Sequence, residues 1–240
     1  MIHKQTTLRQ NGITNWLREH WLLLALIVVS VYVGLPWLAP LFMTLGWTKA
    51  ADAIYFIYQT QCHQLPQRSF FLFGNKAMYS LAEVQAVWEN SVHPNILRQF
   101  TGDTEMGWKV AWSDRMVFMY TSIIFWGIIF YRPLRRGLKP IHWSLFLLLL
   151  LPMAIDGGTH FISDILGGIG GGFRYENLWL ADLTNGTFPV TFYAGDALGS
   201  FNSWMRLISG ILFALGIVWF FFPYLQRSIV YEPNHSHPSG

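Results

Sequence analysis

Long apolar runs that carry no Asp, Glu, Lys or Arg constrain this chain more than any other feature. The stretch from Trp21 to Met43 is the longest of them, and three further apolar stretches, near residues 114–131, 141–162 and 204–225, carry charged residues only toward one end. A helix needs about 20 predominantly apolar residues to cross the hydrocarbon core of a bilayer. The chain is therefore predicted to be an all-α membrane protein, a single integral membrane domain over residues 1–240 with four transmembrane helices at about those four ranges.

Composition agrees with this class and excludes others. Only 12% of the residues are charged, whereas a soluble domain carries about 25%. The net charge of +3 comes from basic residues that flank apolar segments and form no basic stripe on a polar domain, so nucleic acid is excluded as a partner and the lipid bilayer is expected. A single cysteine, Cys62, excludes an internal disulfide and any multi-cysteine metal site.

Basic residues in short connections predict the orientation of a membrane protein, because they stay on the cytoplasmic side. The densest basic cluster lies between the second and third spans, and Lys4 and Arg9 lie near the N-terminus. An even number of spans places both termini and this cluster together, so we expect a multi-pass cell-membrane protein with both termini in the cytoplasm. The long connections over residues 44–113 and 163–203 then lie outside. The basic cluster consists of Arg132, Arg135, Arg136 and Lys139.

The outer connections contain local signals of structure. Apolar residues at helical spacing between Thr48 and Gln61 predict a helix, either interfacial or re-entrant. Ser80 and Glu83 form a capping box that opens a short helix. Asn185 followed by Gly186 predicts a tight turn, the turn of a small hairpin.

Ionisable residues gather at the outer ends of three predicted spans. Asp114 and Arg115 begin the second span, Asp156 and His160 lie in the outer half of the third, and Arg206 begins the fourth. Charge inside a membrane is expensive, so such residues are functional candidates by default. Because the three spans bring them to the same depth, we expect these side chains to converge.

The residue types suggest three kinds of role. Asp156, His160 and Asp164 are spaced four apart, which places them on one helix face, and carboxylates with an imidazole can bind a divalent metal such as zinc. The alternative is that Asp156 pairs with Arg115 or Arg206 and only locks the bundle. The candidates are Asp156, His160 and Asp114 for catalysis, Arg68, Arg115 and Arg206 for holding an anionic substrate, and Cys62, His63, Asp156 and His160 as metal ligands.

One segment carries a family resemblance. The run from Cys62 to Phe71, Cys-His-Gln-Leu-Pro-Gln-Arg-Ser-Phe-Phe, resembles the signature of a family of predicted bacterial membrane proteins of unknown function. Later motifs of that family fit Arg115 with Tyr120, then Asp156-Gly157, and finally Asn202, Arg206 and Gly210. Two cysteines of the family's second motif fall on Ser113 and Met116, so this chain lacks two thiolates, and Asp114 is a candidate oxygen ligand in their place. The resemblance implies a membrane location and supplies no activity.

Three functions are compatible with these observations. The favoured one is a membrane-embedded, metal-assisted hydrolase- or transferase-like enzyme that acts on a lipid-phase or anionic substrate at the outer leaflet, because a metal would activate a bound water. A transporter or channel is the second, since ionisable residues line such pathways. The third is a non-catalytic subunit or assembly factor of a membrane complex, with a haem between His63 and His160 as one version. A homo-oligomer is compatible with each.

Overall fold

A computed structural model describes the backbone of residues 2–231 and the side chains of residues 12–230. The side chains of Lys4 and Arg9, which entered the orientation prediction, lie outside this range. Four helices are long and apolar enough to cross a membrane, which confirms the predicted fold class. They are α1 (Ile2–Thr44), α5 (Asp114–Arg135), α6 (Trp143–Gly167) and α10 (Phe201–Tyr231).

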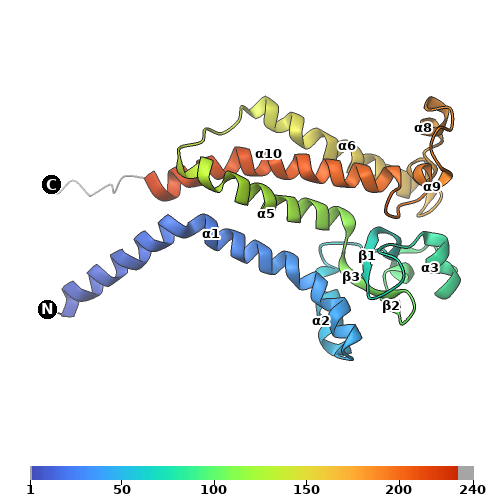
Figure 1. Ribbon diagram of the computed structural model, residues 1–240, viewed down its shortest axis with the longest axis horizontal. Coiled ribbons are helices and arrows are strands. Elements are labelled where there is room, and N and C mark those ends of the chain that lie inside the picture. The colour runs from blue at the N-terminus through green and yellow to red at the C-terminus, as the bar shows by residue number, and fades with distance from the viewer. Residues whose placement is uncertain (1, 232–240) are drawn as a thin grey trace.

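Helix α10 is the central helix of the bundle, with α5 and α6 packed against it and α1 packed against α5 (Figure 1). Small residues allow these close approaches, as they do in many membrane helix pairs. A Cβ added at Gly210 of α10 would lie 3.1 Å from the backbone nitrogen of Met119 in α5. A Cβ added at Gly216 would lie 3.2 Å from Cβ of Leu149 in α6. The two glycines therefore set the spacing of α10 from its two neighbours.

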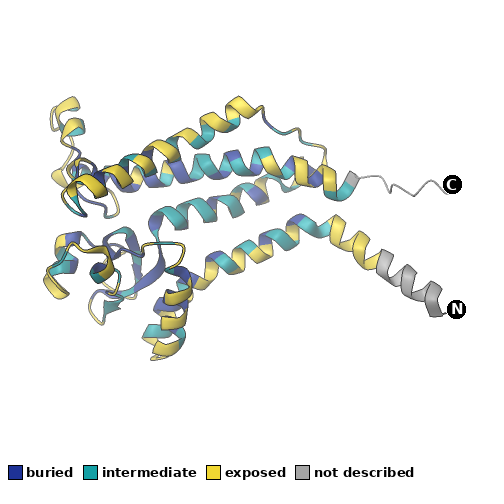
Figure 2. Ribbon diagram, turned by 180° about the vertical axis from the view of Figure 1, so that it is seen from behind, coloured by how far each residue is buried: buried dark blue, intermediate teal, exposed yellow. Residues whose placement is uncertain are grey.

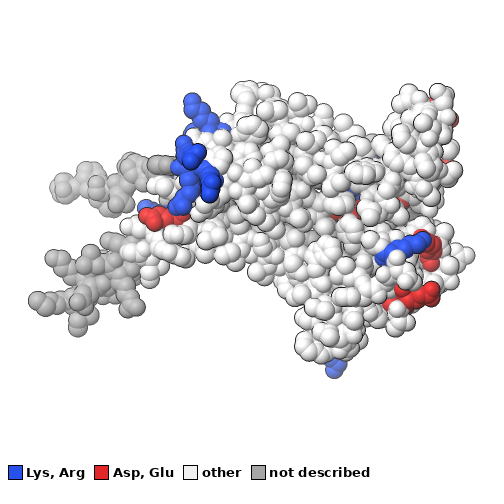
Figure 3. All heavy atoms as spheres, in the orientation of Figure 1, with Lys and Arg blue, Asp and Glu red and all other residues white. Residues whose placement is uncertain are grey.

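The middle of the bundle presents apolar side chains to its surroundings. Only 11% of the apolar window of α6 is buried within the protein, and this helix is coloured mostly as exposed in Figure 2. Figure 3 shows charged side chains gathered at the two ends of the molecule, with an uncharged band between them on the visible face. A helix that is apolar on its exposed faces is characteristic of a membrane span, so this band marks the part that lies in the bilayer.

We call the end of the bundle opposite the start of α1 and the end of α10 its outer end (Figure 1). The first outer connection, between α1 and α5, folds into short helices around a small sheet. The sheet is antiparallel with strand order β1-β3-β2. It was not expected, because β3 has four consecutive buried residues in place of the alternating pattern that predicts a strand. The elements are α2 (Thr48–Tyr58), a 3-10 turn η1 (Pro66–Arg68), β1 (Ser69–Leu72), α3 (Leu81–Val87), α4 (Pro94–Leu97), β2 (Gly102–Asp103) and β3 (Gly107–Ser113).

Two predictions about this connection can be compared directly with the structure. The capping box is confirmed, since Ser80 Oγ accepts from the Glu83 backbone and the Glu83 carboxylate accepts from the Ser80 backbone. The predicted helix after Thr48 is α2, which has 11 residues and is too short to cross the bilayer. Its buried face includes Tyr55 and Tyr58, while Phe56 is 68% exposed.

A buried aromatic cluster fixes this connection to the bundle. Trp112 of β3 is fully buried. Its ring stacks on Tyr120 of α5 at a centroid distance of 4.9 Å and meets Tyr58 of α2 and Tyr32 of α1 edge-on at 5.2 and 5.1 Å. The Tyr58 hydroxyl also donates to the backbone carbonyl of Tyr32 at 2.7 Å. Because β3 continues directly into α5, the sheet and the spans pack as one body.

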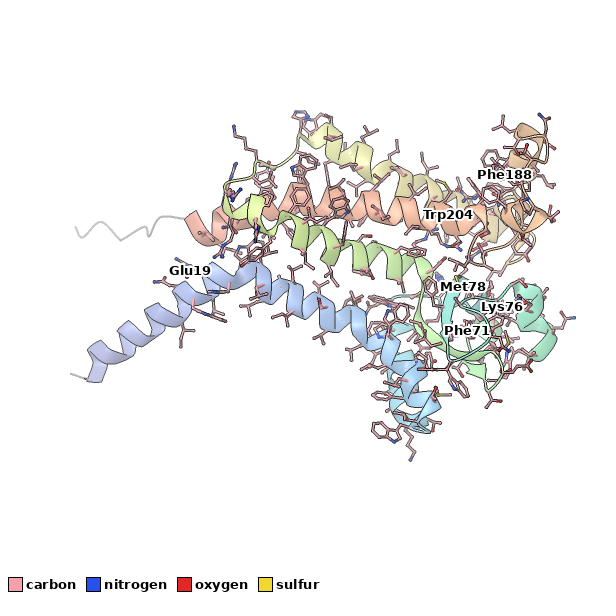
Figure 4. All side chains as sticks on the ribbon, in the orientation of Figure 1. Glu19, Phe71, Lys76, Met78, Phe188 and Trp204 are labelled. Carbon is pink, nitrogen blue, oxygen red and sulfur yellow. The ribbon has the colours of Figure 1, made fainter. Side chains whose placement is uncertain are left out.

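A second apolar core lies farther out in the same connection. It includes Phe71 and Tyr79, whose rings meet edge-on at 5.1 Å. Figure 4 labels Phe71, Met78 and Lys76 in this connection. Lys76 forms an exposed ion pair with Glu83. The connection therefore has its own hydrophobic core beyond the membrane helices.

The regular structure of the second outer connection consists of three short helices. They are α7 (Phe173–Glu176), α8 (Leu178–Leu183) and α9 (Val190–Tyr193). Asn185 and Gly186 do form a tight turn, with φ of 50° and 65°. This turn ends α8, because the Gly186 nitrogen donates to the Ala181 carbonyl at 2.9 Å. The predicted hairpin is wrong, since α8 precedes the turn, α9 begins at Val190 after it, and no strand lies on either side in the described part of this connection.

Lys109 is a buried amine at the centre of the small sheet. Its side chain is fully buried, and Nζ donates to the backbone carbonyls of Gln64 at 2.8 Å and Arg98 at 2.9 Å. No carboxylate among the described residues pairs with it. Burial, opposed by Cys62 and assisted by Arg98, lowers the pKa of Lys109 to about 7.

The depressed pKa of Lys109 predicts a stability that rises with pH. The unfolded chain holds the lysine proton up to its ordinary pKa of about 10.4, and the folded chain gives it up near 7. Between about pH 7 and pH 10 the unfolded state binds more protons, so stability rises by up to about 1.4 kcal/mol per pH unit. Thermal unfolding followed by tryptophan fluorescence measures this slope. The slope flattens in Lys109→Met, and an identical slope in that variant would refute the assignment.

The glycine contacts predict unequal effects of two matched substitutions. Gly210→Ala brings a methyl group against the backbone of α5, which yields only if the two helices separate. A Cβ at Gly127 would lie 2.6 Å from Leu26 Cδ2, and this flexible side-chain end rotates away. We expect Gly210→Ala to destabilise the bundle by about 1 kcal/mol more than Gly127→Ala, measured by unfolding in a mixed-detergent titration. Equal midpoints for the two variants would show that α10 and α5 are not in close contact.

Candidate functional site

Arg206, in the first two turns of α10, joins two carboxylates at the outer end of the bundle. Its side chain is 2% exposed. Nε donates to Asp114 Oδ2 at 2.7 Å, and Nη1 donates to Asp196 Oδ1 at 2.9 Å. Asp114 is the first residue of α5 and Asp196 lies in the connection just before α10, so this one guanidinium ties three segments together.

The chain of ion pairs continues from Asp196 to Arg68 in the other outer connection. Arg68 Nε donates to Asp196 Oδ2 at 2.8 Å, and its two terminal nitrogens bind Asp164 of α6 at 2.7 and 3.0 Å. Burial raises the pKa of Asp196, but the guanidinium groups of Arg68 and Arg206 outweigh burial and hold that pKa well below its usual range. Burial lowers the pKa of Arg68, and the two carboxylates more than reverse this. Both groups are therefore ionised at neutral pH.

A second group of charges is centred on Asp156 of α6. Arg115 Nη1 lies 2.7 Å from one oxygen of this carboxylate, and Arg174 Nη2 donates to the other at 2.8 Å. Arg174 also donates to Thr159 Oγ1 at 2.7 Å and to Asn202 Oδ1 at 3.1 Å. One carboxylate is thus shared by two guanidiniums, one from α5 and one from α7.

The two groups have opposite net charge. The triad, Arg115, Asp156 and Arg174, has two cations and one anion. The pentad has two cations and three anions, and it consists of Asp164, Arg68, Asp196, Arg206 and Asp114. With all eight groups ionised the total is zero, which reduces the cost of placing so many charges near the hydrocarbon core.

His160 is buried among these charges and uses little of its hydrogen-bonding capacity. The residue is 5% exposed, and Nε2 has no hydrogen-bond partner within the described part of the chain. Asp196, Arg68 and Arg206 are its strongest electrostatic neighbours. A buried imidazole nitrogen without a partner is able to bind a ligand or to exchange a proton with one.

The structure brings together most of the residues that the sequence singled out. Asp114, Arg115, Asp156, His160 and Arg206 converge at one end of the bundle, as expected. Asp156 pairs with Arg115, which was one of the two partners considered for it. Arg68 joins them through its contacts with Asp164 and Asp196.

The Cys-His pair is not part of this charged cluster. Cys62 Sγ lies 3.3 Å from Ser113 Oγ, just before α5 begins, and His63 is exposed. No set of three or more His, Cys, Asp or Glu side chains among the described residues is arranged to hold a metal ion. Each aspartate of the cluster is engaged by arginine instead. Zinc binding by Cys62, His63, Asp156 and His160 stays a prediction.

Sequence reasoning missed two charged members of the cluster. Arg174 and Asp196 both lie in the second outer connection, which was treated as a loop outside the membrane. Both are nevertheless buried, at 6% and 2% exposure. Charge balance could not reveal them, because Asp114 and Asp156 of the recognised spans are already matched in number by Arg115 and Arg206.

Fold and site together define a multi-spanning α-helical membrane protein with a buried network of Arg–Asp pairs at one end. The chain belongs to the family described as "Predicted membrane protein (DUF2085)", whose model matches residues 93–220. The predicted membership of a membrane protein family of unknown function is confirmed. The matched range contains every member of the triad and pentad except Arg68. The run from Cys62 to Phe71 lies before it, so that signature stays a prediction.

The chain is also similar to an individual protein. An uncharacterized protein of Methanocaldococcus jannaschii, MJ1492, is 28% identical over 154 residues, which cover 61% of this chain and 76% of the relative. No solved structure matches the chain. These comparisons supply no activity.

The pentad predicts a large cost for removing its central cation. Arg206→Met leaves Asp114 and Asp196 buried with one partner fewer, which costs about 3–5 kcal/mol when a buried pair is broken. The matched control is Arg135→Met at the other end of α5, because Arg135 is exposed and its loss costs about 1 kcal/mol or less. Unfolding in a detergent titration measures both. Similar midpoints for the two variants would contradict the network.

Proposed function

We propose that this protein binds an anionic amphiphile, such as a lipid carrying an acidic headgroup, at the outer end of the bundle. The observation that carries this proposal is the sharing of Asp156 by Arg115 and Arg174. Two guanidiniums on one carboxylate leave a local excess of one positive charge. Arginine is well suited to bind phosphate or carboxylate through two parallel hydrogen bonds.

Access supports Arg115 as the group that meets the ligand. Its side chain is 22% exposed, whereas the side chain of Arg174 is 8% exposed. Arg115 is held by Asp156 and by a contact from Nη1 to Met153 Sδ at 3.4 Å. An acidic headgroup bound at Arg115 would be the second anion on this guanidinium, after the carboxylate of Asp156.

The surface of α6 supports the amphiphilic nature of the ligand. Ile155, Phe161 and Ile162 are 50–66% exposed on the helix that also carries Asp156 and His160. In the bilayer these exposed side chains contact acyl chains. A lipid can therefore lie along α6 with its headgroup at the charged end and its tail on the apolar face, as the favoured interpretation of the sequence requires.

Catalysis is an extension of this proposal that rests on His160. Its unpartnered Nε2 is the group in the cluster that is best placed to move a proton, because the carboxylates are paired with arginine. Asp114 and Asp156 serve in this view to hold the arginines in position. The outside location rests on the basic connection between α5 and α6, which contains Arg132, Arg135, Arg136 and Lys139.

Binding of short-chain lipids by the detergent-purified protein tests the proposal. We expect native mass spectrometry to show a preference for phosphatidic acid over phosphatidylcholine of the same chain length. Arg115→Gln weakens binding of the acidic lipid by about tenfold or more, the value of one charged hydrogen bond. The fold should persist, since Asp156 keeps Arg174 as a partner.

Arg135→Gln is the matched control, because it removes a guanidinium from the opposite end of the same helix. It should bind phosphatidic acid as the unmodified protein does. The proposal fails if the unmodified protein does not discriminate between the two lipids. It also fails if Arg115→Gln and Arg135→Gln bind the acidic lipid equally well.

A further inference from the structure

A polar recess of about 250 Å³ lies in the first outer connection, on different residues from the charged cluster. One wall is formed by α2 and the residue that follows it, and it contains Asp52 and Gln59. The other is the segment that follows α4, with Arg98, Gln99 and Thr101. The recess is smaller than the roughly 300–1,000 Å³ pockets that hold drug-sized ligands, so its volume suits a molecule of amino-acid size.

The two walls carry opposite charges that the described residues do not neutralise. Asp52 and Arg98 both line the recess, and neither takes part in an ion pair within the described part of the chain. They differ in this from Arg68, Arg115, Arg174 and Arg206, each of which is held by a carboxylate. A carboxylate and a guanidinium that line the same recess are free to bind a ligand with two charges.

Lys109 supports the wall of the recess that carries Arg98, both by hydrogen bonds and by its charge. Its Nζ donates to the carbonyls of Arg98 and Gln64 at 2.9 and 2.8 Å, and its own carbonyl accepts from the Tyr55 hydroxyl at 2.5 Å. Tyr55 and Gln64 also line the recess. The buried lysine thus holds three lining residues in place, and its ammonium form adds positive charge on the side of Arg98.

We propose that this recess binds a small zwitterion, with its anionic group at Arg98 and its ammonium group at Asp52. A simple anion of the same size would be repelled by Asp52, and a simple cation by Arg98 and Lys109. The amides of Gln59 and Gln99 supply neutral hydrogen-bond donors and acceptors between the two charges. The arrangement selects for both charges in one molecule.

Small zwitterions of this kind occur as free α-amino acids and as the phosphoethanolamine headgroup of a lipid. Phe56 lines the recess and is 68% exposed, so an apolar side chain stands beside the charged walls. Both sources place an ammonium a few bonds from an anionic group. The binding measurement separates them.

Isothermal titration of the detergent-purified full chain tests the proposal. The probes are glycine and O-phosphoethanolamine as zwitterions, acetate and methylammonium as single charges, and bilayer discs with and without phosphatidylethanolamine. We expect saturable binding of at least one zwitterionic probe at about millimolar concentration or below. Each single-charge probe should bind at least about tenfold more weakly, since it forms one charged contact in place of two.

Substitutions then assign the contacts. Arg98→Gln and Asp52→Asn should each weaken zwitterion binding about tenfold or more. Lys76→Gln is the matched control, because Lys76 is a cation of the same connection in an exposed pair with Glu83, and it should leave binding unchanged. The proposal is refuted if no zwitterionic probe binds, if acetate or methylammonium binds equally well, or if the Arg98 and Asp52 variants match the Lys76 control. None of these outcomes depends on lipid binding at Arg115.

Discussion

The pairing of Arg206 with Asp114 and Asp196 is the interaction on which the outer half of this protein depends. All three side chains are at most 2% exposed, so none has bulk water to solvate it. An unpaired charge there would cost several kcal/mol, and a paired one costs far less. The positions of α5, α10 and the second outer connection are therefore coupled, because moving any one of them separates a buried pair. The close contact of α5 with α10 at Gly210 keeps Arg206 within reach of Asp114.

Much of this arrangement follows from the sequence. The four spans were predictable because uncharged runs of about 20 residues leave few other structures, and helical periodicity with orientation placed Asp114, Arg115, Asp156, His160 and Arg206 at one depth. The partners supplied by the outer connections were not predictable. Arg174 and Asp196 are adjacent to no apolar run, and Arg68 meets Asp196 across 128 residues of sequence. Such contacts depend on how the connections fold back, which no local pattern encodes.

The small sheet was missed for a related reason. Its longest strand is buried on both faces by α1, α2 and α5, so Val110, Ala111 and Trp112 show no alternation of apolar and polar residues. Its partner strand β1 begins 38 residues earlier, at Ser69. The second span was correctly predicted to begin at about residue 114, so this apolar run was left within the connection without an assigned structure.

The division of charges narrows the chemistry that the cluster can perform. Carboxylates that accept hydrogen bonds from arginine are poorly placed to ligate a metal, and this moves attention from the aspartates to His160 and to the partly exposed Arg115. The triad and the pentad also differ in sign, so an anion and a cation would be drawn to different parts of the same cluster. The cluster is therefore better suited to binding a ligand according to its charge than to catalysing a reaction on it.

The long sequence separations within the network have a consequence for how the protein is made. Asp114 is translated 92 residues before Arg206, so at about 5–20 residues per second the carboxylate waits roughly 5–20 seconds for its partner. During that interval α5 and α6 carry Asp114 and Asp156 without their full set of guanidiniums. The bundle therefore reaches its final arrangement only when the last helix enters the membrane, and the biosynthesis of the first three helices yields an intermediate whose outer ends remain open to water, lipid headgroups or chaperones.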